Sequence, residues 1–486
     1  MKKYMLKLAL LSGVTMVLFS CQKSTLNPTS TTALDDKTAF ATLDRIDGQV
    51  KGIYAAIKSG QVLGGRYFLY NDARAENLVS EDPNRVTVRA PWEFSVGSSD
   101  DEPRNLWSNA YSTINRANLF LDGMEAGGNA VAGAKATEFQ GEARFLRGLS
   151  YYILVTTFAR PYWDGNGSKR GLPLRLKGIK GPGFNELAPV TVAEVYTQIL
   201  QDLDFAETNL AATVADATAR TTRAHKNTAI ALKTRVYLSM RDYPKVITEA
   251  NKIVSTTAPF KAPSGVANAL AANITNLFTG TSTDLENIFS MPFTVNDAPG
   301  TQNQLGHYYR PSSAGGQGIF SLNANGVIGD TKWTKADDRR KLIDTASSKS
   351  YLKKFNSGSP WLDFAPVIRY SEVMLNLAEA LARGNAGVDA RAVELLNAVR
   401  NRSDKTTTYT TASFANQAEL LVAILQERNI EFLGEGIRSL DIWRLGLDFP
   451  TKSSGGFIVT AIPSTSPAYI FPISSDETRL NPLISN

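Results

Sequence analysis

The segment from Arg369 to Gly384 reads RYSEVMLNLAEALARG, and its pattern predicts the fold. Four of its apolar side chains recur at the spacing that lines one face of an α-helix, namely Tyr370, Met374, Leu377 and Leu381. Gly384 is a typical helix end, and a second amphipathic stretch follows it. We therefore expect residues 366–402 to form a pair of helices.

A similar helix pair is predicted for residues 225–257, where Pro244 suits the first turn of the second helix. Units of this size resemble tetratricopeptide repeats, which are helix pairs of about 34 residues that stack on one another. Thr191 and Glu194 predict a capping box at the start of another helix, and residues 137–140 predict a helix start in the same way. Further helices are expected at 38–59, 104–125 and 416–433.

Long stretches rich in Gly, Pro, Ser, Thr and Asn separate these helices, at residues 60–103, 160–190, 258–365 and 447–486. Loops of this length are unusual in a compact domain and are often functional when ordered. We expect them to hold many aromatic side chains outside the core. The predicted fold is mainly α. Stacked tetratricopeptide-like helix pairs form a scaffold, and long irregular loops with little β-structure form the ligand-facing side.

The first twenty residues have the features of a secretory signal. Three lysines precede an apolar run from Leu8 to Phe19, which is shorter than the roughly 20 residues of a membrane-spanning helix. Leu18, Ser20 and Cys21 resemble the lipobox of bacterial lipoproteins, in which the cysteine thiol is acylated after cleavage. We interpret residues 1–20 as a lipoprotein signal peptide, Cys21 as the lipidation site and residues 21–38 as a polar tether.

The composition excludes several kinds of site. The chain has 486 residues with one cysteine and two histidines, so it cannot form an intramolecular disulfide, a cysteine-based zinc site or a three-histidine metal site. The net charge of +6 falls to +3 when the three lysines of the signal are removed, which does not indicate nucleic-acid binding. We expect no metal, no cofactor and no nucleic-acid partner.

Residues 427–444 read ERNIEFLGEGIRSLDIWR and are unusually rich in charge. Glu427, Glu431 and Glu435 are four residues apart and would repel one another unless arginines lie between them. One interpretation is a paired-carboxylate hydrolase site. The interpretation that we favour is a buried Arg–Glu network that joins helices. The helix around Glu142 and Arg147 should likewise pair with a neighbour, for example with Glu372 or Glu379.

Several motifs, taken in their order along the chain, resemble those of the SusD/RagB family of surface lipoproteins of Bacteroidota. They are the lipobox, Trp107 to Asn118, Gln140 to Arg147, Arg369 to Ala380, Glu427 to Arg444, Phe471-Pro472-Ile473 and Leu480-Asn481-Pro482. The resemblance covers nearly the whole mature chain. It implies a nutrient-binding protein that is not an enzyme. It also implies that residues 39–260 and 261–486 are two regions of one compact globular unit.

The resemblance further implies a location and partners. Family members are anchored by their lipid to the outer membrane, face the cell exterior, and cover a SusC-like TonB-dependent barrel. They capture a glycan, or in some members a peptide, and deliver it to the barrel. Two alternatives to a glycan-binding protein stay open at this point: a surface glycoside hydrolase, and a tetratricopeptide scaffold that binds no small ligand.

Sugar rings have apolar C–H faces and polar edges, so a glycan site combines flat aromatic side chains with hydrogen-bonding groups. In the family, the ligand-binding aromatics come from the loop before the tryptophan-containing helix and from the long central loop. The matching candidates here are Trp92, Tyr308, Tyr309 and Trp333, with Arg74, Asn77, Asn303 and Arg310 as polar partners.

Overall fold

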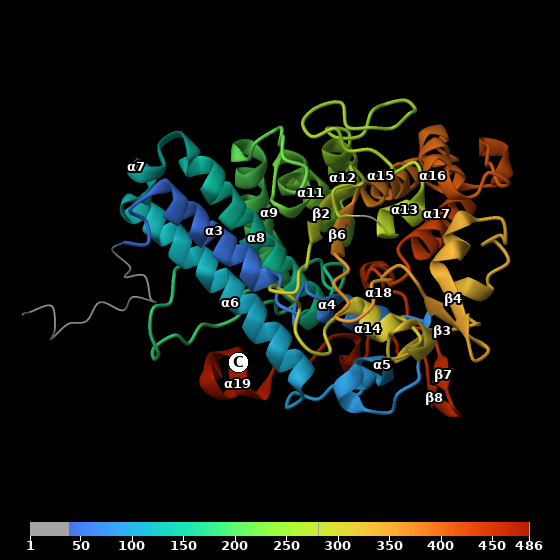
Figure 1. Cartoon of the computed structure of the whole chain (residues 1–486), viewed down its shortest axis with the longest axis horizontal. Coiled ribbons are helices and arrows are strands. Elements are labelled where there is room, and N and C mark those ends of the chain that lie inside the picture. The colour runs from blue at the N-terminus through green and yellow to red at the C-terminus, as the bar shows by residue number, and fades with distance from the viewer. Residues whose placement is uncertain (1–37, 280, 486) are drawn as a thin grey trace, which may run out of the picture.

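The computed structural model describes residues 38–279 and 281–485, so the signal segment and Cys21 lie outside the described residues. Four helices form one side of the molecule (Figure 1): α3 (Leu43–Ile57), α6 (Asp101–Gly123), α8 (Ala136–Phe158) and α9 (Val192–Asn209). Helix α8 contacts each of the other three. It is apolar around most of its circumference, which suits a helix at the centre of a bundle.

The helices continue as a stack from α9. Its members are α11 (Lys226–Met240), α12 (Tyr243–Ala250), α15 (Tyr370–Gly384), α16 (Ala390–Ser403), α17 (Gln417–Glu431) and α18 (Arg438–Leu445). Helix α9 contacts α11, α12 contacts α15, and α15 contacts both α16 and α17. The predicted pairs at 225–257 and 366–402 are thus confirmed as α11–α12 and α15–α16. The mainly α, tetratricopeptide-like fold is confirmed with them.

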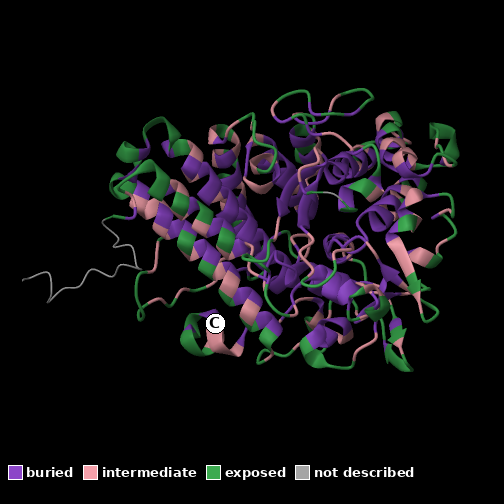
Figure 2. Ribbon diagram, in the orientation of Figure 1, coloured by how far each residue is buried: buried purple, intermediate pink, exposed green. Residues whose placement is uncertain are grey.

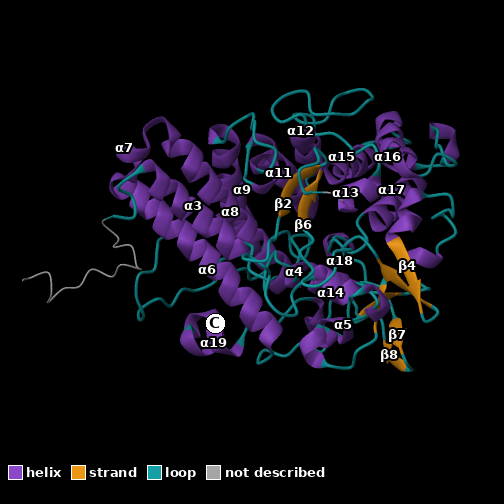
Figure 3. Ribbon diagram, in the orientation of Figure 1, coloured by secondary structure: helices purple, strands orange, loops and turns teal. Residues whose placement is uncertain are grey.

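The β-structure is limited, in the part of the chain that the structure describes, to four antiparallel two-stranded sheets. They pair β1 (Leu78–Ser80) with β3 (Phe320–Leu322), β2 (Asn287–Met291) with β6 (Ala365–Arg369), β4 (Ile343–Ala346) with β5 (Lys349–Leu352), and β7 (Lys452–Ser454) with β8 (Phe457–Val459). The β2–β6 pair lies among the helices, and β4, β7 and β8 lie with the loops at the lower right of Figure 3. The β1–β3 pair joins segments that are far apart in the sequence.

Short helices complete the fold. They are α4 (Arg66–Arg74), α5 (Arg89–Glu93), α7 (Asn129–Ala132), α10 (Ala219–Thr222), α13 (Ile274–Thr279), α14 (Leu305–Tyr309) and α19 (Ser475–Leu480). A π-helical turn, η2 (Met124–Gly128), follows α6, and short 3-10 helices lie at η1 (Arg85–Thr87), η3 (Gly133–Lys135), η4 (Ser312–Ala314), η5 (Val327–Gly329), η6 (Asp338–Leu342), η7 (Thr411–Ser413), η8 (Pro467–Tyr469) and η9 (Pro482–Ser485).

The prediction that residues 60–103 are irregular is wrong, because α4 and α5 lie within them. All nine residues of α4 are buried. Four of the nine are polar or charged (Arg66, Asn71, Asp72 and Arg74), so the segment resembles a loop in composition, and nine residues are too few for a clear helical pattern. Figure 2 shows this buried centre of the molecule.

Of the two capping predictions, one is confirmed and the other is wrong. The box at α9 is confirmed, because the Thr191 side chain accepts a hydrogen bond from Glu194 N and the Glu194 carboxylate accepts one from Thr191 N. The predicted start at residues 137–140 is wrong, because α8 begins at Ala136 without a side-chain cap. The turn η3 runs directly into α8, and Gly133 O accepts a hydrogen bond from Ala136 N, so the backbone takes the place of a cap.

A single cluster of buried apolar residues extends from Ile46 to Ile484. Within it the ring of Phe289, on β2, lies 5.3 Å from that of Phe145 and 6.3 Å from that of Tyr54. Aromatic contacts therefore join residues from before and after position 260. The division into regions 39–260 and 261–486 stays a prediction.

Among the described residues, no helix is both long enough and apolar enough to cross a membrane.

Buried ion pairs join the ends of the helices. Arg369, just before α15, binds Glu431 at 2.7 Å, Glu435 at 2.7 Å and also Glu286. Arg339 and Arg402 bind Glu431 as well. Burial alone would raise the pKa of Glu431, but the arginines outweigh it and hold that pKa well below its usual range. The interpretation of residues 427–444 as a structural Arg–Glu network is confirmed, and these carboxylates are not arranged as a hydrolase site.

A second buried network links α15 to α18. Arg444 binds Glu379 at 2.5 Å and Asp441 at 2.8 Å, and Asp441 also binds Arg428 at 2.9 Å.

The predicted partners of the α8 helix are wrong. Arg147 binds Asp202 of the neighbouring α9 and Glu142 binds Arg223. The glutamates proposed for that role pair elsewhere, Glu372 with Arg235 and Glu379 with Arg444.

We predict that Arg369→Met lowers the free energy of unfolding by about 3–5 kcal/mol, because it leaves three buried carboxylates without their shared cation. Denaturant unfolding followed by circular dichroism measures the change. Arg479→Met is the matched control, since the Arg479 side chain is 68% exposed in its pair with Asp476. Equal stabilities of the two variants would contradict a structural role for the network.

Candidate ligand-binding site

The four predicted aromatic residues are buried. Trp92, Tyr308 and Tyr309 have no exposed surface, and Trp333 is 3% exposed. The expectation that these loop aromatics lie outside the core is therefore wrong. A long loop is held in place only if it buries apolar side chains of its own, and these rings do so beneath their loops. Their contact with a ligand stays a prediction.

Each buried ring also has a polar or cationic partner. Trp92 Nε1 donates to Leu78 O at 2.8 Å, and Tyr309 Oη donates to an Asp72 carboxylate oxygen at 2.6 Å. Burial raises the pKa of Asp72 to about 7. The Arg340 guanidinium lies 4.0 Å from the centre of the Trp333 ring. These contacts hold the rings in place, and the rings in turn support the loops above them.

The predicted polar residues also make contacts within the protein. Arg74 donates to Tyr469 O at 2.6 Å, and Arg310 lies 3.6 Å from Asp344. Asn77 donates to Asn429 Oδ1 at 2.6 Å and accepts from Val327 N at 3.0 Å. The four aromatic and three polar candidates are therefore distributed over several loops and do not line one common cavity.

A pocket of about 410 Å³ lies where the two predicted ligand loops meet, and we call it the loop pocket. Its lining residues come from α4 and the segment before it, from the loop that leads into α6, and from the central loop. They are Gln61, Arg66, Tyr70, Arg85, Val86, Ser99, Asp100, Asp101, Glu102, Asn105, Thr301 and Gln302.

Arg66 is the central cation of the loop pocket. It is 7% exposed, and among the described residues no carboxylate lies within ion-pairing distance of it. Its Nε donates to Asn303 Oδ1 at 3.0 Å and its NH1 group to Val86 O at 3.1 Å. The guanidinium also lies 5.4 Å from the Tyr308 ring. Since a guanidinium has five N–H donors, these two hydrogen bonds leave it able to bind further oxygen atoms.

Tyr308 supports the floor of this pocket from below. Its hydroxyl donates to Gln302 O at 2.9 Å, which fixes one of the lining residues. Acidic residues also line the pocket, and one of them, Asp100, binds Arg85 at 3.0 Å. Glu102 is 7% exposed, and burial raises its pKa. The pocket thus combines donors and acceptors around a small apolar area, which suits a ligand with many hydroxyl groups.

Glycines shape the wall between α4 and the central loop. Gly65 has a φ of +154°, and a Cβ atom there would lie 1.7 Å from Asn303 O. A Cβ atom at Gly60 would lie 2.0 Å from Pro299 O.

Sequence reasoning missed Arg66 and Gln302 as lining residues. The glycines just before Arg66 are the signal that could have found them, because such a cluster indicates close approach of another backbone segment.

Comparisons with known proteins agree with this architecture. The model of the SusD family matches residues 315–486, and a family described as "Starch-binding associating with outer membrane" matches residues 57–238. A crystal structure of a SusD superfamily protein from Bacteroides fragilis is 30% identical, with a TM-score of 0.82 over 92% of this chain and 100% of that one. The chain belongs to the SusD/RagB family.

Two other relatives are more distant in sequence. SusD-like protein P2 from Formosa agariphila is 24% identical over 534 residues, covering 99% of this chain and 98% of its own. Surface glycan-binding protein A from Bacteroides thetaiotaomicron is 18% identical, with a TM-score of 0.70 over 91% of this chain and 98% of that one. The second similarity shows that the two proteins share a fold.

Because Trp92 is fully buried, we predict that Trp92→Ala lowers the free energy of unfolding by about 3–5 kcal/mol. Thermal and denaturant unfolding measure the loss. Phe184→Ala is the control, because Phe184 is a fully exposed aromatic residue of another loop. A Trp92→Ala protein as stable as the wild type would contradict a supporting role for this ring.

Proposed function

We propose that the protein is a cell-surface lipoprotein that captures an oligosaccharide or polysaccharide at the loop pocket and delivers it to a SusC-like TonB-dependent outer-membrane transporter. The observation that carries the proposal is the loop pocket itself. Two loop regions and the start of α4 meet there around a buried guanidinium that has only neutral hydrogen-bond partners.

The chemistry of the pocket supports a glycan as the ligand. Arg66, Gln61 and Asn105 provide N–H donors, and the carboxylates and Gln302 provide acceptors. Sugar hydroxyl groups both donate and accept, so they match such a mixed set better than an apolar ligand does. The matching family is described as starch-binding in association with the outer membrane, which supports the same ligand class.

A binding role also fits the charge arrangement better than catalysis. The three glutamates of residues 427–435 are committed to buried ion pairs. In the loop pocket Asp100 pairs with Arg85 and Asp101 with Arg104, which leaves Glu102 as the one carboxyl group of that lining without an ion-pair partner among the described residues. A glycosidase needs one carboxylic acid and one carboxylate on the two sides of a bound sugar. We therefore propose a protein that binds and transfers its glycan without cleaving it.

We predict that the double variant Asn105→Ala/Gln302→Ala weakens glycan binding about tenfold or more, because it removes two polar contacts of about 0.5–1.5 kcal/mol each. Affinity electrophoresis against a polysaccharide panel identifies the ligand, and isothermal titration calorimetry measures the affinity. Gln201→Ala on the exposed face of α9 is the control. Unchanged affinity of the double variant would place the glycan elsewhere.

We also predict that Cys21→Ser abolishes attachment to the outer membrane, because one thiol carries the proposed lipid. Metabolic labelling with palmitate and membrane fractionation measure the loss. In the wild type, mild detergent extraction should recover a large β-barrel protein together with this chain. A labelled, membrane-bound Cys21→Ser protein would contradict the anchor, and failure to recover a barrel would contradict the partner.

A further inference from the structure

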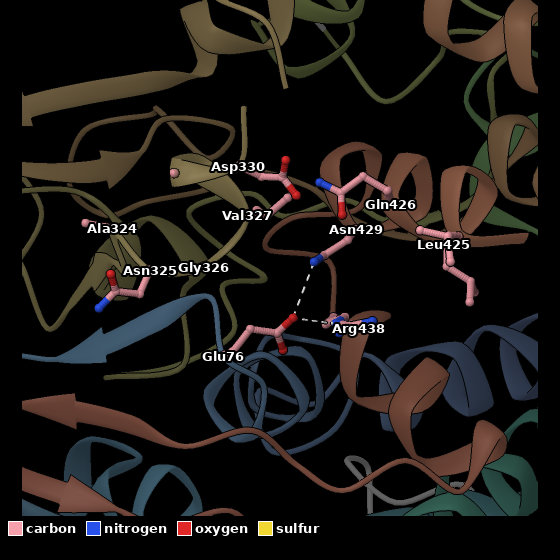
Figure 4. Close-up of a pocket in the computed structure, with 12 residues that line it drawn as sticks. Glu76, Ala324, Asn325, Gly326, Val327, Asp330, Leu425, Gln426, Asn429 and Arg438 are labelled. Carbon is pink, nitrogen blue, oxygen red and sulfur yellow. Dashed lines mark hydrogen bonds and ion pairs between the residues drawn. The ribbon is translucent and has the colours of Figure 1, made fainter. Parts of the chain in front are cut away.

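A second pocket, of about 560 Å³, lies at the other end of α4 (Figure 4). Arg66, the first residue of α4, lines the loop pocket, whereas Glu76 follows the helix and lines this second pocket. At 1.5 Å of rise per residue, α4 separates the two by roughly 12 Å. We call it the α17 pocket, because one face of α17 forms a wall of it. It shares no lining residue with the loop pocket.

The wall from α17 has both polar and apolar groups. Val422, Leu425, Gln426 and Asn429 follow one another at the spacing of a single helix face. Val422 is 55% exposed, although it is apolar. An exposed aliphatic side chain beside two amides offers an apolar contact and hydrogen bonds to the same ligand. A sugar ring has this combination of an apolar face and a polar edge.

Two polar atoms in this pocket have no partner among the described residues. One Glu76 carboxylate oxygen accepts hydrogen bonds from Arg438 at 2.7 Å and from Asn429 at 3.4 Å. The other oxygen, Oε2, is buried and has no partner, and the same is true of Gln426 Nε2. A buried polar group without a hydrogen bond costs about 1–3 kcal/mol. A side-chain rotation that brings either atom to the pocket surface would let a hydroxyl group satisfy it, because a hydroxyl both donates and accepts.

The pocket is held rigidly from below by Asn77. Its side chain bonds to Asn429 on α17 and to Val327 N in the 3-10 helix η5. The backbone packs tightly here, since a Cβ atom at Gly326 would lie 3.0 Å from Asn77 Oδ1. A wall fixed in this way loses little conformational entropy when a ligand binds, and this favours affinity. Asn77 thus has a structural part in forming a pocket.

The charges around the α17 pocket select against anions. Its lining has two carboxylates, Glu76 and Asp330, and one cation, Arg438, which already binds Glu76. The surplus of negative charge disfavours uronic acids and sulfated sugars. A neutral sugar with free hydroxyl groups meets no such repulsion.

We propose that the α17 pocket is a second carbohydrate site, which binds a neutral sugar residue through Glu76, Gln426 and Arg438 with its apolar face on Val422. The ligand class rests on the proposed function, but the site is separate from the loop pocket. A polysaccharide that reaches both sites binds more tightly than a short fragment does, because the second contact is made within the complex.

The test uses neutral glucose hexasaccharides of different linkages, and one uronic acid oligomer, in titration calorimetry. The proteins are the wild type, the loop-pocket variant Asn105→Ala/Gln302→Ala, and the α17-pocket variants Gln426→Leu and Val422→Asp. Gln201→Leu is the matched control for the glutamine substitution. We expect the loop-pocket variant to retain binding of a neutral hexasaccharide, and Gln426→Leu in that background to weaken it about tenfold.

Each result has a separate meaning. The second site is wrong if the loop-pocket variant loses all binding. It is also wrong if the remaining binding of that variant is unaffected by Gln426→Leu and by Val422→Asp. In both cases the proposed function stands. If the uronic acid oligomer binds in a manner that depends on Gln426, the assignment to a neutral sugar is wrong. If no neutral hexasaccharide binds the wild type although a polysaccharide of the panel does, the second site for a neutral sugar is wrong while the proposed function stands; if the polysaccharide panel also fails, the proposed function is wrong.

Discussion

The interaction on which the rest of the structure depends is the cluster of Arg369 with Glu286, Glu431 and Glu435. An isolated buried charge is very costly, so these groups are tolerated only together and with their hydrogen bonds complete. Arg369 is the last residue of β6 and directly precedes α15, Glu286 lies just before β2, and Glu431 ends α17. Three segments that are distant in sequence must therefore meet with correct geometry. This requirement fixes the end of α17 and, through it, the wall of the α17 pocket.

The helical scaffold could be predicted from the sequence because its helices are long and several of them are amphipathic. Residues 370–384 show one apolar stripe, and Asp242 and Pro244 mark the turn before α12. The helix α4 could not be predicted in this way, since it has only nine residues and four of them are polar or charged although they are buried. The ion-pair partners of the buried charged residues could not be predicted from the sequence either. The sequence contains Arg147 and several acidic residues, but only the packing of α8 on α9 selects Asp202.

The candidate ligand site was predictable in part. The two loop regions that were expected to bind ligand do meet, and the loop pocket lies between them. The aromatic residues in those loops proved to be buried, because sequence composition does not distinguish a ring that contacts a ligand from one that supports a loop. Arg66 and Gln302 depend on a close approach of two backbone segments, which only the glycines at positions 60 and 65 indicate.

The burial of these rings also separates two tasks that many binding proteins assign to the same residues. Trp92, Tyr308 and Tyr309 hold the loops in place from inside, while the rims carry amides and other polar side chains that contribute little to stability. Rim residues such as Gln302 and Asn325 can therefore be exchanged during evolution without loss of the fold. A single scaffold of this kind is able to diverge toward many ligands, one side chain at a time.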